Sequence, residues 1–164
     1  MDDIILEIQK NLNDAILNAA AEEPIKQIKK VYYWDPVLIA KQFMPALVIM
    51  PASESITSRS NKQDEDNLVL NISYVYNIKD SFGSDDNEKV TWIQEAVQLL
   101  TWRNCKAGSF KENSIIWILR KNFYINDNAT LQNEVAVNYN FDLVDNKPVF
   151  KATLTVAFKI IANI

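Results

Sequence analysis

The chain has 164 residues, of which 48% are hydrophobic and 23% are charged, and these values fit a single globular domain with its own core. It has no histidine and one cysteine, which excludes Ser–His and Cys–His nucleophilic sites, an internal disulfide and a cysteine pair for a metal. The formal net charge is −4 without a cluster of basic residues, which argues against sequence-specific binding to nucleic acid. Because the sequence has neither a signal peptide nor a membrane span, we expect synthesis in the cytoplasm and no membrane partner.

The first predicted element is an amphipathic helix from about Asp3 to Glu22, which Pro24 closes. Its apolar stripe recurs at helical spacing and consists of Ile5, Ile8, Leu12, Ile16 and Ala19. Lys29 to Trp34 then predicts a short strand rich in aromatic residues, since Tyr and Trp favour extended backbone. Asp35-Pro36 ends this strand and can start a brief helical turn through Lys41.

The next segments are a strand and a polar stretch. Ala46 to Met50 lies between two prolines and is apolar on both faces, which predicts a strand inside the sheet. Ser53 to Asn67 is the most polar part of the chain, and we expect an extended loop or a hairpin tip there.

From Leu68 the sequence alternates between apolar and polar residues, which predicts a long, half-buried strand. Asp80 to Asn87 predicts a turn, and residues from about Asp86 to Arg103 predict a second amphipathic helix.

The last third of the chain predicts three further strands. Ile115 to Leu119 is a short, unbroken apolar run, which we interpret as a central strand. Two long alternating strands follow, with Asp145-Asn146-Lys147 as the hairpin turn between them. The predicted fold class is therefore α+β: a two-layer sandwich in which two main helices pack on a mostly antiparallel sheet.

Two acidic segments could carry chemistry. Asp80 to Glu88 resembles a calcium loop in composition, but it lacks the ligand and glycine spacing of an EF-hand, so a helix-capping turn is preferred. The run Asp64-Glu65-Asp66 could pair with Asp142 or Asp145 as catalytic carboxylates, but nothing in the sequence places them about 5–10 Å apart. We therefore predict no catalytic, cofactor-binding or metal-binding residues and no enzymatic activity.

Two apolar features favour protein contacts instead. The cluster Tyr32-Tyr33-Trp34 could stack on bases, but it has no basic groove beside it, so core or interface is preferred. The terminal hairpin is long and apolar on one face, and a strand at the end of a sheet exposes backbone groups that proteins blunt or pair with a partner. The sequence therefore predicts homo-oligomerisation, with a well-covered sheet as the alternative.

The order of these segments resembles one protein family. The opening helix, Val31-Tyr32-Tyr33-Trp34-Asp35-Pro36, the segment Met44-Pro45-Ala46-Leu47-Val48-Ile49-Met50-Pro51 and the polar stretch after it are similar to the tail terminator and tail-completion proteins of long-tailed bacteriophages. The resemblance implies a ring, six-membered in this family, that caps the tail tube at its head-proximal end, stops tube polymerisation and offers a docking surface to the head-completion or connector protein. DNA would pass through the lumen without sequence-specific binding, and the location would be the virion.

Within that resemblance, the polar stretches Ser53–Asn67 and Asn122–Gln132 are the expected contacts between subunits or rings. The charged side chains expected to set register and partner choice are Arg59, Lys62, Asp64 and Glu65. A neck or head-completion protein is the alternative within virion assembly. A small carboxylate-dependent enzyme and a monomeric binding module are the alternatives from other classes.

Overall fold

The computed structural model describes residues 2–34, 39–60, 63–77, 94, 96–101, 103–104, 109–110, 112–121, 124–125, 129–144 and 147–163. The helical elements are α1 (Asp2–Asn18), the 3₁₀ helices η1 (Pro24–Gln27) and η2 (Lys41–Phe43), a helical segment at residues 96–101, and α3 (Ile115–Lys121). The strands are β1 (Lys30–Tyr33), β2 (Ala46–Ser60), β3 (Gln63–Asn77), β4 (Arg103–Asn104), β5 (Ser109–Phe110), β6 (Tyr124–Ile125), β7 (Ala129–Val144) and β8 (Lys147–Asn163).

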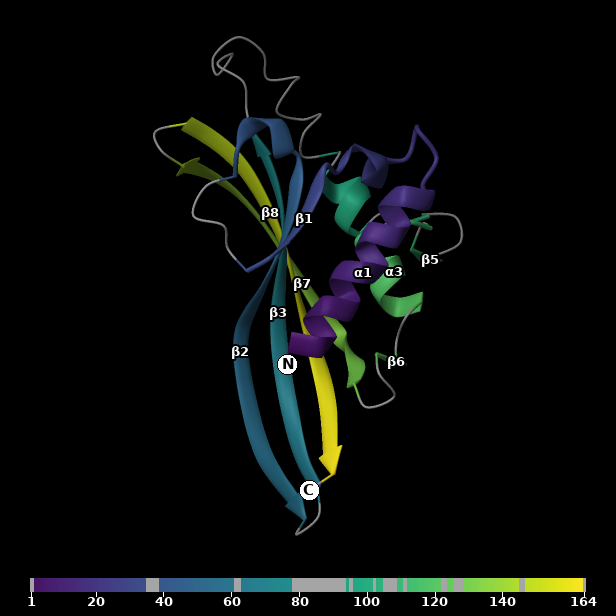
Figure 1. Ribbon diagram of the computed structural model, residues 1–164, viewed down its shortest axis with the longest axis vertical. Helices are drawn as coiled ribbons and strands as arrows, with labels where there is room; N and C mark the ends of the chain where they lie inside the picture. The colour runs from purple at the N-terminus through teal and green to yellow at the C-terminus, as the bar shows by residue number, and fades with distance from the viewer. Residues whose placement is uncertain are drawn as a thin grey trace.

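One mostly antiparallel sheet organises the chain, with strand order β1-β2-β3-β8-β7-β6 (Figure 1). Among the described strands, β1 and β2 are the one parallel pair, and β4 and β5 form a separate two-stranded sheet. The α+β class is thus confirmed, as are the two long terminal strands, which pair with each other. The expectation that the last strand lies at the margin of the sheet is wrong, because β8 pairs with β3 on one side and with β7 on the other.

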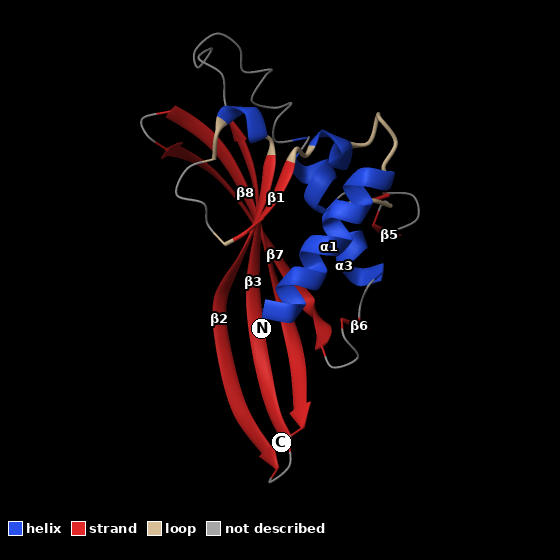
Figure 2. Ribbon diagram, in the orientation of Figure 1, coloured by secondary structure: helices blue, strands red, loops and turns tan. Residues whose placement is uncertain are grey.

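The core lies between the helices and one face of this sheet. In Figure 2, α1 and α3 lie on the same side of the strands. The alternation of β3 and β8 explains this arrangement, since Leu68, Leu70 and Ile72 are all buried, as are their partners on β8. Those partners, which are Leu154, Val156 and Phe158, belong to the same hydrophobic core.

The face of the sheet away from this core is more polar. There, the Ser73 and Thr153 hydroxyls lie 2.9 Å apart, and the Thr155 hydroxyl donates to the Asn71 side-chain oxygen at 2.8 Å. These two ties join β3 to β8 and satisfy polar groups that would otherwise be desolvated alone. They also favour this register over its neighbours, because a one-residue slip would exchange the two faces.

α1 is shorter than the sequence pattern predicts. It ends at Asn18 instead of near Glu22, and the Lys26 ammonium donates hydrogen bonds to the carbonyls of Ile16 and Leu17 at 3.0 and 2.9 Å. These are two of the carbonyls that a helix end leaves without an intrahelical partner. Pro24 therefore begins a separate 3₁₀ turn instead of ending α1.

The polar stretch 53–67 is part of a hairpin, which is one of the two predicted alternatives, but almost all of it is strand and not loop. It forms the far halves of β2 and β3, which pair from Ala46↔Val75 to Ser60↔Gln63, with register shifts after Pro51 and after Ser58. Only residues 61–62, at the tip, lie outside the described residues. The loop prediction fails because alternation of small and β-branched polar residues, such as Ser55, Thr57 and Ser58, also suits a strand whose side chains face water.

The prediction of a central strand at Ile115–Leu119 is also wrong. These residues belong to α3, whose first turn is closed by a hydrogen bond of 3.0 Å from the Ile118 N–H to the Ser114 carbonyl. A short apolar run cannot distinguish a buried strand from a buried helix by periodicity alone. Burial of Ile115, Ile116, Ile118 and Leu119 leaves no polar face to reveal the helical period.

The predicted second helix is described only in part. Residues 96–101 are helical, with Ala96, Leu99 and Leu100 buried, whereas Arg103 already belongs to β4, so the helix ends earlier than predicted. The predicted turn at 80–87 and the start of that helix lie outside the described residues, as do Asp145 and Asn146 of the terminal turn.

Candidate assembly surface

The most distinctive surface of the chain is a projecting arm of strands. We define the distal arm as residues 53–60 of β2 and 63–69 of β3, which continue past the helices together with the end of β8 (Figure 1). The C-terminus lies beside the tip, since Gln63 pairs with Asn163. Because residues 52–58 of β2 are exposed while residues 63–67 of β3 are half-buried, β2 forms the solvent side of the arm.

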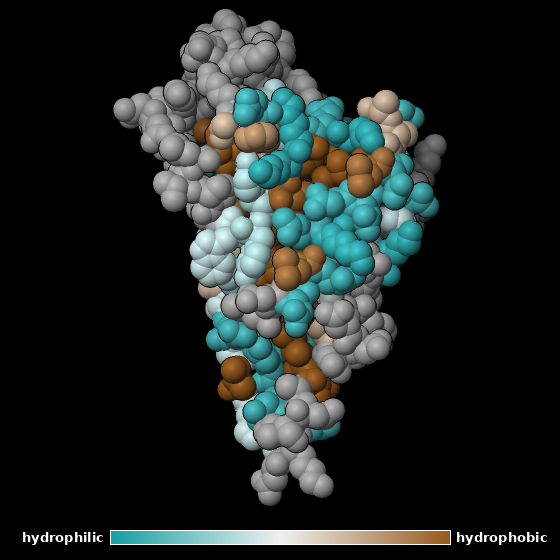
Figure 3. Space-filling view, viewed as in Figure 1, coloured by the Kyte–Doolittle hydropathy of each residue, from teal (hydrophilic) through white to brown (hydrophobic). Residues whose placement is uncertain are grey.

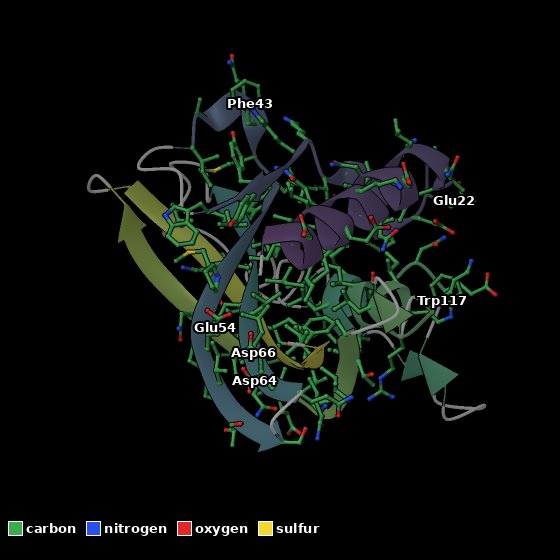
Figure 4. The ribbon with its side chains drawn as sticks, turned by 60° about the horizontal axis from the view of Figure 1, so that its bottom comes forward. Glu22, Phe43, Glu54, Asp64, Asp66 and Trp117 are labelled. Atoms are coloured by element: carbon green, nitrogen blue, oxygen red, sulfur yellow. The ribbon has the colours of Figure 1, made fainter. Side chains whose placement is uncertain are left out.

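Carboxylates line one face of this arm. Glu54, Asp66 and Asp64 follow one another along β2 and β3 in Figure 4, and Glu54 and Asp66 share the face of Leu68. One Asp66 oxygen is buried and finds no hydrogen-bond partner among the described residues. Ile56, directly opposite Asp66 on β2, is 68% exposed. The face is therefore both acidic and apolar, and Figure 3 shows hydrophobic atoms beside hydrophilic ones at this end of the molecule.

The opposite face of the arm carries an ion pair. Lys159 of β8 contacts the Glu65 carboxylate at 2.8 Å, with its side chain 35% exposed and that of Glu65 22% exposed. Antiparallel pairing places Glu65 next to Ile161 and puts Lys159 one diagonal step away. Glu65 thus binds within its own chain, whereas Asp64 points to the other face.

The structure brings only part of the predicted contact set together. Asp64 and Glu65 are adjacent on β3, on opposite faces. Arg59 lies in β2, where its backbone is placed but its side chain is not described, and Lys62 lies outside the described residues. Of the second predicted contact region, residues 124–125 form β6 and residues 129–132 begin β7, so these parts are strands as well.

The carboxylate pairing weighed from the sequence does not match the strand register. Asp142 is level with Val149 of β8 and Asn77 of β3, whereas Asp66 is level with Ile160. Eleven strand positions separate the two levels, or roughly 36 Å at about 3.3 Å per residue. That separation is several times the ~5–10 Å that a two-carboxylate mechanism needs. Asp145 lies outside the described residues.

A small acidic cavity lies between the start of η1, the helical segment 96–101 and the turn before α3. Its volume is about 240 Å³, and it is lined by Glu22, Glu23, Pro24, Gln98, Glu112, Asn113 and Ser114. The Asn113 amide donates a hydrogen bond of 2.6 Å to the Glu23 carboxylate, and Asn113 has a positive φ of 64°. This contact ties the start of η1 to the turn before α3, so Glu23 has a structural role. Among the described residues, no group of three or more acidic or thiol side chains is arranged to hold a metal ion.

The aromatic cluster divides among three environments. Tyr33 packs on the main core, and Tyr32 packs on the far face of the sheet beside Val48 and Val75. Trp34 is 56% exposed and has a positive φ of 71°, and its ring meets that of Tyr33 edge to face. The sequence-based choice between core and interface therefore applies residue by residue, and Trp34 is the member that remains accessible.

No protein-family model matches the chain, and no curated protein matches it either. Within the described part of the chain, none of the helices has both the length and the hydropathy needed to cross a bilayer.

Proposed function

We propose that this chain is a structural virion protein that assembles with copies of itself into a ring at the head-proximal end of a phage tail tube. There it would end tube polymerisation and provide the docking surface for the head connector. In this proposal the chain is a two-layer sandwich, with the helices on one face of the sheet. The other, more polar face of the sheet would face the DNA path.

The distal arm is the observation that carries this proposal. It extends the sheet beyond the helices and exposes Ile56 at 68%, so part of its apolar surface is not used for the chain's own core. Burying an exposed isoleucine against a partner would contribute roughly 1.5–3 kcal/mol. A donor from that partner would also satisfy the buried Asp66 oxygen, whose lack of a hydrogen bond otherwise costs about 1–3 kcal/mol.

The polar face supports the role assigned to the lumen. Its described residues include Asn71, Ser73, Thr153 and Thr155, and two hydrogen bonds join their side chains in pairs. The lysines whose side chains are described on this face, which are Lys30, Lys151 and Lys159, lie apart from one another, and Lys159 is paired with Glu65. Phosphate binding needs clustered Lys or Arg, so such a face would let DNA slide past without holding it.

Native mass spectrometry over a wide range of concentration tests the ring directly. We expect one discrete closed assembly, with six copies as the size that the family resemblance implies. A tail tube protein is then added, and electron microscopy measures whether tubes stop growing at a capped end. A ring that does not bind the tube protein but does bind a connector would indicate a neck or head-completion protein instead. A chain that remains monomeric both alone and on tube ends would refute the proposal.

The charged tip supplies a sharper comparison. Asp64→Asn removes a charge on the acidic face without changing side-chain size, and the matched Glu65→Gln removes a charge that is engaged with Lys159. If the acidic face docks on the tube, Asp64→Asn should slow tube capping and weaken its salt dependence, because exposed charges act chiefly on association rates. Equal effects of the two variants would argue against a role for this face.

A further inference from the structure

The sheet has two long edges that no described strand covers, at opposite sides of the molecule. β1 pairs with β2 only from Ala46 to Ile49, so residues 51–60, here called the β2 outer edge, lack a neighbouring strand. β6 pairs with β7 only at residues 129–130, so residues 135–144, here called the β7 outer edge, also lack one. Strands in this position offer backbone donors and acceptors to any chain that can pair with them.

The β1 edge shows how the same sheet is protected elsewhere. α1 packs beside β1, and its Gln9 amide donates a hydrogen bond of 2.9 Å to the Val31 carbonyl. The Trp34 N–H then donates to the Ile49 carbonyl at 2.9 Å, and the described part of β1 and its flank ends at this residue. Protection therefore stops where the β2 outer edge begins.

The residues and bulges that normally prevent pairing occupy only parts of the two open edges. Proteins blunt exposed edges with lysine, proline, inward-pointing charges or strong bulges. The β7 outer edge reads Val-Ala-Val-Asn-Tyr-Asn-Phe from 135 to 141 and contains no charged residue there. The β2 outer edge has its proline and first bulge at the start and charged residues at Glu54 and Arg59. Between its two register shifts it is regular from Ser53 to Ser58. Ile56 is exposed in the middle of that regular stretch.

We propose that the β2 outer edge of one copy pairs with the β7 outer edge of the next, so that the sheets of neighbouring copies join. This inference rests on the self-assembly in the proposed function and specifies its interface. Each of the pairs β2–β3, β3–β8 and β8–β7 is antiparallel, so β2 and β7 run in opposite directions within one copy. Copies related by rotation in a ring therefore meet through an antiparallel ladder. The contact is heterologous, since each copy contributes a different edge to each neighbour.

The offset between the two edges is compatible with ring closure. Val135 is level with Pro51 through Val156 and Leu70, so the open part of β7 begins where the covered part of β2 ends. Full overlap of the edges shifts neighbouring copies by about eight residues, or roughly 27 Å along the strands, and overlap of six residues shifts them by about five residues, or roughly 17 Å.

Each copy contributes four strands to a joined sheet, a width of about 19 Å. A closed ring without axial rise therefore needs strands tilted by roughly 40–55° to its axis, and this interval overlaps the ~35–45° tilt of closed β-barrels. The offset thus favours a closed ring over a flat stack of copies.

The test removes one backbone donor from each edge separately. The strand register directs the N–H groups of Ile56 and Val137 away from the neighbouring strands of their own chain, where proline is tolerated. Ile56→Pro and Val137→Pro should each leave the folded chain monomeric, with at least a tenfold loss of assembled protein in native mass spectrometry. The matched Ile56→Thr and Val137→Thr variants keep the donors and should assemble within about twofold of the unsubstituted protein.

Mixing the two proline variants tests the head-to-tail arrangement. One retains an intact β7 outer edge and the other an intact β2 outer edge, so an equal mixture should form a two-chain species and nothing larger. Circular dichroism confirms folding, and Ser58→Pro replaces Ile56→Pro if that variant unfolds, since its N–H has the same direction.

The outcomes separate this inference from the proposed function. Proline variants that assemble as the unsubstituted protein does would overturn strand pairing and leave the ring proposal standing. A dimer of Val137→Pro alone would show β2-to-β2 pairing and overturn the head-to-tail ladder, as would folded variants whose mixture stays monomeric. An unsubstituted protein that stays monomeric at every concentration would overturn the strand-pairing interface, whatever forms on tube ends.

Discussion

Phe158 offers a direct measure of how the sheet is ordered. It is fully buried in β8, between Leu68 of β3 and Leu131 of β7, at the point where the distal arm leaves the core. Phe158→Ala removes an aromatic ring from a site enclosed by strands on both sides, which leaves little room for the surroundings to collapse. We expect the free energy of unfolding to fall by about 3–5 kcal/mol, from the lost transfer energy plus the cavity. For a chain of this size the melting temperature should fall by roughly 6–20 °C.

Urea denaturation followed by far-ultraviolet circular dichroism measures this loss at equilibrium. Lys159→Ala is the control, because it changes the next residue of β8, on the opposite face, where a half-exposed ion pair contributes no more than about 1 kcal/mol. If β8 were the last strand of the sheet, Phe158 would keep one open flank and its truncation would cost much less. A loss below about 1.5 kcal/mol for Phe158→Ala would therefore refute the central position of β8.

Three further predictions concern local features of the fold. Asn113→Asp would place a second carboxylate at the 2.6 Å contact with Glu23, and like charges raise the pKa of one of the two in the folded state. The stability measured by urea titration should therefore fall as pH rises above about 4. Asn113→Ala, the control, should show no such pH dependence. Ser114→Ala removes the hydroxyl that accepts the Trp117 N–H at 3.4 Å and should lower the free energy of unfolding by about 0.5–1 kcal/mol. Ser114→Thr keeps a hydroxyl and should lower it less. An unchanged denaturation midpoint for the alanine variant would contradict a capping role. Burial raises the pKa of Tyr139 above its usual value, and a hydrogen bond to Thr101 partly offsets the shift. The free energy of unfolding should therefore fall as pH rises past about 10, and it should fall less steeply in Tyr139→Phe. Identical slopes of stability against pH for the two proteins would contradict this expectation.

The sequence indicated which stretch contains the surface proposed for assembly, but it did not predict that this stretch is a pair of strands or which face each side chain occupies. Asp64 and Glu65 were singled out because they lie in the most polar stretch, and they do belong to the projecting arm. Their opposite faces follow from the period of a strand, so the loop interpretation concealed that Glu65 binds Lys159 while Asp64 does not share that contact. Ile56 was missed because one apolar residue in a polar run carries no periodic signal.

The α+β class, the amphipathic opening helix and the alternation of the long strands followed from the sequence. These features depend on a repeat of 3.6 or 2 residues that burial against one face imposes along many positions. The sequence also predicted an exposed sheet edge, although it placed that edge at the terminal strand.

Tertiary structure decided what local patterns could not. Ile115–Leu119 is a helix, which its sequence did not reveal because four of its five residues are buried and helix and strand patterns then look alike. The polar stretch became an arm because β8 gives β3 a partner along its full length. Among the described residues, the uncovered edges are parts of β2 and β7, beyond their short contacts with β1 and β6. The hydrogen-bonding partner of a strand comes from a distant part of the chain, so no local pattern records which stretch of strand is left uncovered.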